Sequence, residues 1–192
     1  MLKFLFNYLF NKQSYRLPKP PANVGTYDYK SNPEDLKADK EFVFAWAEFI
    51  RGQLLNPINY IQQPLFKTFI NSHEVRGYIY GHLCQALLDY QCIHDMPDSR
   101  GHAILSACYY NVFHVQSDWY RKATLDLLNE EKFKVGERVG QSDYHANKLS
   151  KSLKFRNLEK MVILMLPVNE AYGVCRKMGF NPDEYFKFDY DI

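Results

Sequence analysis

Hydrophobic residues recur at helical spacing along most of the chain, and residues 75–93 give the clearest pattern. At about 100° per residue, one broad, largely apolar arc of this segment comprises Val75, Tyr78, Ile79, His82, Leu83, Ala86, Leu87, Tyr90 and Ile93. A second stripe of small residues, Gly77, Gly81 and Cys84, continues to Leu88. Two packing faces on one helix predict a central buried helix with neighbours on both sides.

Helix-start and helix-stop signals predict further helices over most of residues 32–192. Asn32-Pro33 combines a capping residue with a proline at the first helical position, and acidic residues follow it. Gly136 and Gly140 predict a loop between two later helices. Residues 161–166 are apolar on every side, so periodicity leaves open whether they form one short strand or a helix.

The first eleven residues form a segment of their own. Residues 1–11 predict a short apolar helix whose narrow polar stripe comprises Lys3, Asn7 and Asn11. The segment is shorter than the roughly 20 residues that span a bilayer, so we expect no transmembrane segment. Docking into a groove of its own domain is the favoured interpretation, and weak membrane-surface contact through residues 1–10 is the alternative. Residues 12–31 contain three prolines and predict an extended connector.

Composition places the chain among ordinary globular proteins. With 192 residues, 46% hydrophobic and 24% charged, it fits a single domain, 1–192, with a helical core at 32–192. We therefore predict a mainly α, single-domain, multi-helix globule. The aromatic fraction of 16% favours protein interfaces as well as a packed core. Four cysteines without disulfide-framework spacing predict reduced thiols and a cytoplasmic location.

Charge is balanced overall and uneven along the chain. A net charge of +2 does not indicate a specific nucleic-acid partner. A basic stretch runs from Lys148 to Lys160, and an acidic stretch covers residues 183–191. Either stretch offers electrostatic complementarity to a partner. The candidate binding residues are Lys148, Lys151, Lys154, Asp183, Glu184 and Asp189.

A His-Asp doublet raises a metal-dependent alternative. The sequence His94-Asp95, followed by Gly101-His102, resembles the HD-type metal phosphohydrolases, which are helical enzymes. The resemblance implies a cation site that activates water for attack on phosphate, with the ligands His73, His94, Asp95 and Asp143. The other interpretation is that the doublet caps the end of the central helix.

A second family resemblance lies near the end of the chain. The stretch MVILMLPVNEAYGVCRKMGF resembles the last strand and helix of GCN5-type acetyltransferases, with Asn169, Lys177, Gly179 and Phe180 at matching positions. The resemblance implies acetyl-CoA binding, although Cys175 stands where the family has a tyrosine. A helix closed by a glycine cap explains the same residues without a cofactor.

No Walker loop, G-x-S-x-G motif or paired-cysteine zinc motif occurs in the sequence. We therefore predict a protein that binds another protein without catalysing a reaction, and we expect no cofactor. A bacterial immunity or antitoxin-type protein, or an adaptor, is the role that this composition favours. The acetyltransferase and the phosphohydrolase are the alternatives.

Overall fold

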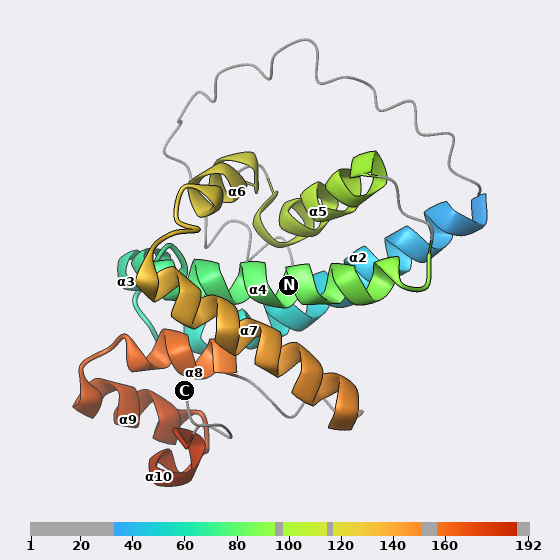
Figure 1. Cartoon of the computed structure of the whole chain (residues 1–192). Coiled ribbons are helices and arrows are strands. Elements are labelled where there is room, and N and C mark those ends of the chain that lie inside the picture. Colours follow the sequence, from blue (N-terminus) through green and yellow to red (C-terminus); the bar gives the residue numbers. More distant parts are fainter. Residues whose placement is uncertain (1–32, 95–97, 115–116, 151–156, 188–192) are drawn as a thin grey trace.

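The computed structural model describes residues 33–94, 98–114, 117–150 and 157–187, and within these ranges all regular structure is helical. The prediction of a mainly α fold is thus confirmed. The helices pack as a multi-helix globule (Figure 1). In chain order they are α2 (Pro33–Ile58), α3 (Gln63–Ile70), α4 (His73–Gln91), α5 (Asp98–Phe113), α6 (Ser117–Leu125), α7 (Glu131–Ser150), α8 (Asn157–Leu164), α9 (Val168–Lys177) and α10 (Pro182–Tyr185).

Helix α4 is the central buried helix that the sequence predicts. Ser72 caps it by accepting a hydrogen bond from the backbone N–H of Val75 at 3.3 Å. Side chains on its apolar arc, among them Tyr78 and Leu83, are completely buried. The helix ends at Gln91, two residues earlier than predicted, and Ile93 beyond it is 79% exposed.

Helices α4 and α7 run in parallel and touch through glycines. A Cβ atom on Gly77 would lie 2.1 Å from the carbonyl oxygen of Phe133, and one on Gly81 would lie 2.2 Å from that of Glu137. The contact is reciprocal, because a Cβ on Gly140 would lie 2.1 Å from the carbonyl oxygen of Tyr78. Only glycine allows two helix backbones to approach this closely.

The prediction of a loop at Gly136 and Gly140 is wrong, because both residues lie inside α7. Glycine lowers helix propensity by about 1 kcal/mol, and this is why the local pattern indicated a break. Here the burial of the α4 stripe against α7 outweighs that cost.

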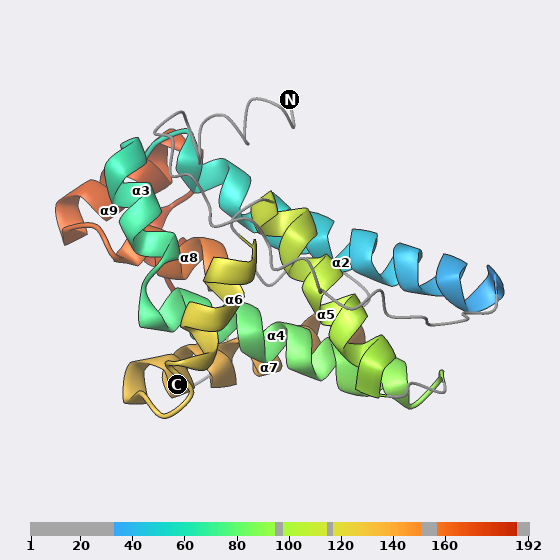
Figure 2. The same cartoon turned by 90° about the horizontal axis from the view of Figure 1, so that it is seen from above.

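Helices α2 and α5 form a second parallel pair, and from above α5 lies over α2 and α4 (Figure 2). The rings of Trp46 on α2 and Tyr109 on α5 pack with centroids 6.5 Å apart. Helix α8 closes the core from the other side, and its side chains Leu158, Val162 and Ile163 are completely buried.

The apolar run at 161–166 forms no strand, because residues 161–164 are the end of α8 and Met165 and Leu166 follow in the turn before α9. Its apolar residues face several helices at once, since α8 packs against α2, α3, α4 and α7. That arrangement explains the lack of a one-sided pattern.

A buried histidine links α4 to α2. The indole N–H of Trp46 donates a hydrogen bond to Nδ1 of His82 at 3.1 Å, and the ring of Phe49 stacks on the imidazole. Burial lowers the pKa of His82 to about 3. His82 is therefore a neutral, hydrogen-bonded core residue at neutral pH.

We expect this histidine to make stability fall with pH. An unfolded chain takes up the proton near pH 6.5, whereas the folded chain excludes it until about pH 3. Between pH 7 and pH 5, the free energy of unfolding should therefore fall by about 2 kcal/mol from this group. Urea titrations of the wild type and of His82→Gln measure the effect. Burial also lowers the pKa of His114, so some slope remains in the variant, but equal slopes in both proteins would contradict the assignment.

Candidate protein-binding groove

A groove runs between α2 and α5 on the outer side of the second helix pair. Its volume is about 370 Å³. From α2 it is lined by Leu36, Asp39, Lys40, Val43 and Phe44, and from α5 by Arg100, Ala103, Ile104, Ala107 and Asn111. Both sets follow helical spacing, so each helix contributes one continuous face.

The groove exists because small residues of α5 face large residues of α2. Ala103 and Ala107 have little volume to fill the space beside Phe44, which remains 62% exposed. Val43 and Ile104 lie deeper and belong to the hydrophobic core. The groove thus has an apolar floor continuous with the core and a wall that presents an exposed aromatic ring.

One end of the groove is closed by ion pairs. The guanidinium of Arg100, which is only 2% exposed, contacts the carboxylate of Asp39 at 2.7 Å and that of Asp35 at 3.4 Å. Tyr90, at the end of α4, donates its hydroxyl to Asp39 at 2.6 Å. Burial, and then this bond to a carboxylate, raises the pKa of Tyr90 above its ordinary value. These contacts fix the starts of α2 and α5 relative to the end of α4.

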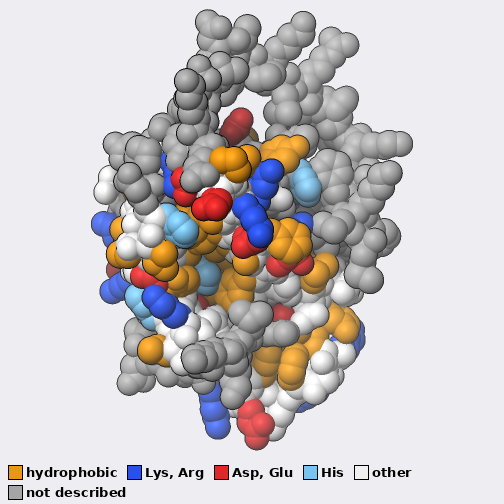
Figure 3. Space-filling model, turned by 90° about the vertical axis from the view of Figure 1, so that its right-hand side faces the viewer, with side chains coloured by type: hydrophobic (Ala, Val, Ile, Leu, Met, Phe, Trp, Pro, Cys, Tyr) orange, Lys and Arg blue, Asp and Glu red, His pale blue; other side chains and the backbone are white. Residues whose placement is uncertain are grey.

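Figure 3 views the molecule from the side at which α2 begins and α4 ends. Hydrophobic side chains on this face are interspersed with charged ones. Apolar side chains are thus exposed at this end of the molecule, as they are on protein surfaces in general.

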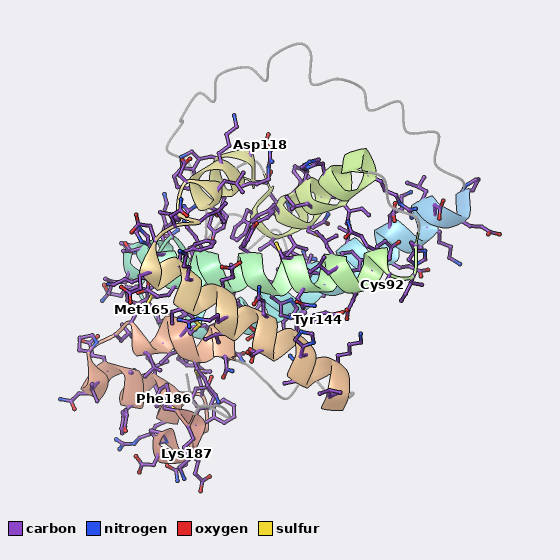
Figure 4. All side chains as sticks on the ribbon, in the orientation of Figure 1. Cys92, Asp118, Tyr144, Met165, Phe186 and Lys187 are labelled. Carbon is purple, nitrogen blue, oxygen red and sulfur yellow. The ribbon has the colours of Figure 1, made fainter. Side chains whose placement is uncertain are left out.

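The predicted basic stretch is not one continuous charged surface. Lys148 contacts Oδ2 of Asp89 at 2.5 Å, and Tyr144 donates its hydroxyl to the same oxygen at 2.9 Å, pointing from α7 toward α4 (Figure 4). These two hydrogen bonds lower the pKa of Asp89. Lys160 is largely buried and donates to the carbonyl oxygen of Lys187 at 2.8 Å.

The other predicted binding residues divide into two groups. Asp183 and Glu184 are exposed in the first turn of α10, which Asn181 caps. Carboxylates at a helix start are also stabilised by the helix dipole. Lys151, Lys154 and Asp189 lie outside the described residues.

The histidines of the phosphohydrolase resemblance are not brought together. His73 is the first residue of α4 and His94 follows its end, so they lie about 30 Å apart along the helix axis. Within the described ranges, no three His, Cys, Asp or Glu residues are placed to hold a metal ion. Asp95 lies outside these ranges.

Asp143, the last residue of the predicted ligand set, is completely buried and has a structural environment. It accepts hydrogen bonds from the hydroxyl of Tyr78 at 2.6 Å, from Nδ2 of Asn157 at 2.6 Å and from the Asn157 backbone N–H at 3.2 Å. Gln53 extends the network by donating to the hydroxyl of Tyr78 at 3.2 Å. The carboxylate thus joins α7 to α4 and to the start of α8.

The local structure near the end of the chain also differs from the one that the acetyltransferase resemblance implies. It implies a strand before Asn169, but α8 is a helix there. Gly179, at φ +86°, follows the end of α9. The backbone N–H of Phe180 then donates to the carbonyl oxygen of Cys175 at 3.1 Å. This is the glycine-capped helix end that was the alternative interpretation.

Sequence reasoning did not identify the groove. No pattern in the sequence predicted a role for Phe44, Ala103 or Ala107. The available signal is a pair of alanines at i, i+4 on one helix and a phenylalanine off the buried face of another. That signal becomes specific only when the two helices are known to be neighbours.

No protein-family model, curated protein or solved structure matches the chain. Among the helices in the described ranges, none has the length and hydrophobicity needed to cross a bilayer.

Proposed function

We propose that this protein binds another protein, and that the groove between α2 and α5 receives an amphipathic helix of the partner. The observation that carries the proposal is an apolar groove lined by one face of each of two parallel helices. Leu36, at 43% exposed, and Phe44, at 62%, stand at its α2 side. Exposed apolar side chains around a groove are the usual features of a helix-binding site.

The shape of the groove favours a helix over a small molecule. From Leu36 to Phe44 the α2 face extends over about two helical turns, or roughly 12 Å. A partner helix with apolar residues at i, i+3 or i+4, and i+7 matches that length. Phe44 has the character of a binding hot spot, because an exposed aromatic ring loses much water-accessible area when a partner covers it.

Charged residues outside the groove support a role in selectivity and rate. Asp183 and Glu184 are exposed on α10, and Lys148 is exposed on α7 apart from its contact with Asp89. We propose that such groups steer a partner by long-range attraction, which raises the association rate more than the affinity.

We further propose that this binding serves an immunity, antitoxin or adaptor role in the cytoplasm of a bacterium. Proteins of these kinds act by covering a surface of one partner and need no catalytic site. The cysteines Cys84, Cys92, Cys108 and Cys175 are free thiols, which suits a reducing compartment.

Phe44→Glu is expected to weaken the binding of a partner at least tenfold, or by about 1.4 kcal/mol, because a carboxylate would replace the ring at the groove wall. Leu88→Glu is the matched control: Leu88 is an exposed apolar residue on α4, 54% exposed, and it does not line the groove. The measurement uses the protein captured by the wild type from its native cells, purified and titrated by calorimetry against both variants. Equal affinities for Phe44→Glu and wild type would overturn the proposed surface.

A further inference from the structure

The groove between α2 and α5 begins where the described part of the chain begins. Pro33 starts α2, and Leu36, three residues later, already lines the groove. The residues before Pro33 therefore enter the molecule next to this groove. They include a strongly apolar segment, residues 1–10, with the letters MLKFLFNYLF.

The length of the preceding chain allows this segment to return to the groove. Residues 12–32 can extend over at most about 70 Å, which exceeds any distance along the groove. As a helix, residues 1–10 would measure about 15 Å, close to the roughly 12 Å of the α2 face from Leu36 to Phe44. The tether also gives the segment an effective concentration of order 1 mM at a nearby site.

The chemistry of the segment matches that of the groove. Seven of its ten residues are Leu, Phe or Tyr, and as a helix it keeps only Lys3 and Asn7 on a narrow polar stripe. The groove offers the apolar atoms of Val43, Ile104 and two alanines. Docking would cover both apolar surfaces and leave the polar stripe in water.

We infer that residues 1–10 occupy the groove between α2 and α5 in the free protein, as an intramolecular helix. A partner helix then binds only after it displaces this segment. The displacement rests on the proposed function, whereas the docking stands without it. The segment acts as an internal competitor. The partner's apparent association constant is therefore the intrinsic constant multiplied by the fraction of molecules in which the segment is undocked.

Hydrogen–deuterium exchange of the full-length protein tests the docking without a partner. If the isolated affinity is about 0.1 mM, tethering at about 1 mM leaves the segment roughly nine-tenths docked. Amides of residues 1–10 should then exchange about tenfold more slowly than in the Leu5→Asp/Phe6→Asp double variant. Ala103→Glu should abolish this protection, because Ala103 is exposed on α5 and lines the groove. Leu88→Glu, outside the groove, should retain it.

The outcomes separate the inference from its alternatives. Rapid exchange of residues 1–10 in the wild type would overturn it. Protection that appears only after addition of phosphatidylglycerol vesicles would also overturn it, in favour of the membrane surface. Protection that survives Ala103→Glu would place the segment elsewhere and would overturn the groove assignment.

The partner measurements then give a separate result. If docking is confirmed but groove variants bind a partner as well as the wild type does, the proposed function fails and the docking stands. If both hold, the Leu5→Asp/Phe6→Asp variant should bind the partner about tenfold more tightly than the wild type, because its groove is open.

Discussion

Replacing Gly81 by alanine is expected to destabilise the protein by about 3 kcal/mol or more, whereas the same substitution at Gly52 should stabilise it. A Cβ on Gly81 would lie 2.2 Å from the carbonyl oxygen of Glu137 and 2.8 Å from its carbonyl carbon. These are backbone atoms of α7, so no change of rotamer can relieve the overlap. The two helices must separate, and the buried surface between them is then lost.

Gly52 is the matched control, because it is exposed within α2 and a Cβ there would meet nothing within 4 Å. Alanine should add about 0.5–1 kcal/mol at this position through helix propensity and a less flexible unfolded chain. Urea denaturation of both variants gives the two signs. A stable Gly81→Ala protein would contradict the close approach of α4 and α7.

A double variant tests whether one substitution moves α4 and α7 far enough apart to relieve the overlap at the second site as well. Gly140→Ala, on α7, adds a Cβ at 2.1 Å from the carbonyl oxygen of Tyr78 in the same interface. Once Gly81→Ala has moved the helices apart, the second substitution should cost little more. We therefore expect the double variant to lose less free energy of unfolding than the sum of the losses in the two single variants. At independent sites, the two losses would add.

Replacing Asp143 by alanine is expected to cost about 3–5 kcal/mol, because three buried donors lose their acceptor and each such loss costs about 1–3 kcal/mol. The substitution removes the acceptor for the hydroxyl of Tyr78 and for two donors of Asn157, all in a buried environment. Buried donors that lose their partner carry the full cost of desolvation. The start of α8 also loses the carboxylate that binds its first backbone N–H.

Asp89→Ala provides the comparison, because Asp89 also accepts hydrogen bonds from a tyrosine and a second donor, but at the surface beside Lys148. Exposed ion pairs contribute about 1 kcal/mol or less, so the two variants should differ by at least 2 kcal/mol in urea denaturation. Equal costs would show that the Asp143 network contributes no more than a surface ion pair. Metal analysis of wild-type protein and of Asp143→Ala separates this structural role from the phosphohydrolase alternative, which requires bound metal that the variant loses.

The central helix was predictable because the spacing of residues within this one segment defines both of its packing faces. Tyr78 and Leu83 fall on the apolar arc and are completely buried, and Gly77 and Gly81 fall on the stripe that packs against α7. Both observations need only the spacing of residues within one helix. The capping residue Ser72 is equally local, because its side chain accepts a hydrogen bond from the backbone N–H of Val75, three residues later.

The partner of that glycine stripe was not predictable in the same way. A glycine pair such as Gly136 and Gly140 indicates a loop when only neighbouring residues are considered. Its meaning changes because a second glycine pair, Gly77 and Gly81, about 60 residues earlier, allows the backbones to meet. Sequence spacing within a segment carries no information about such a distant match.

The candidate site could not be predicted for the same reason, because the sequence does not show which helices are neighbours. The resemblance to HD-type phosphohydrolases implied Asp143 as a metal ligand, but the surroundings of Asp143 come from α4 and α8. The groove arises between Phe44 and two alanines on another helix, and its existence depends on how α2 and α5 pack. Charge patterns were similarly incomplete: Lys160 belongs to a basic stretch in sequence and is largely buried in the fold.

The glycine-lined face of α4 also limits the order in which a growing chain can complete its fold. Synthesis delivers α4 before α7, with α5 and α6 between them, and α7 ends at Ser150, whereas α4 ends at Gln91. At ordinary translation rates the ribosome needs about 3–12 s to add the intervening residues. Throughout that interval the bare backbone of Gly77 and Gly81 has no helix to cover it. A nascent chain that stalls before residue 131 would therefore expose this face to chaperones and to other unfinished chains.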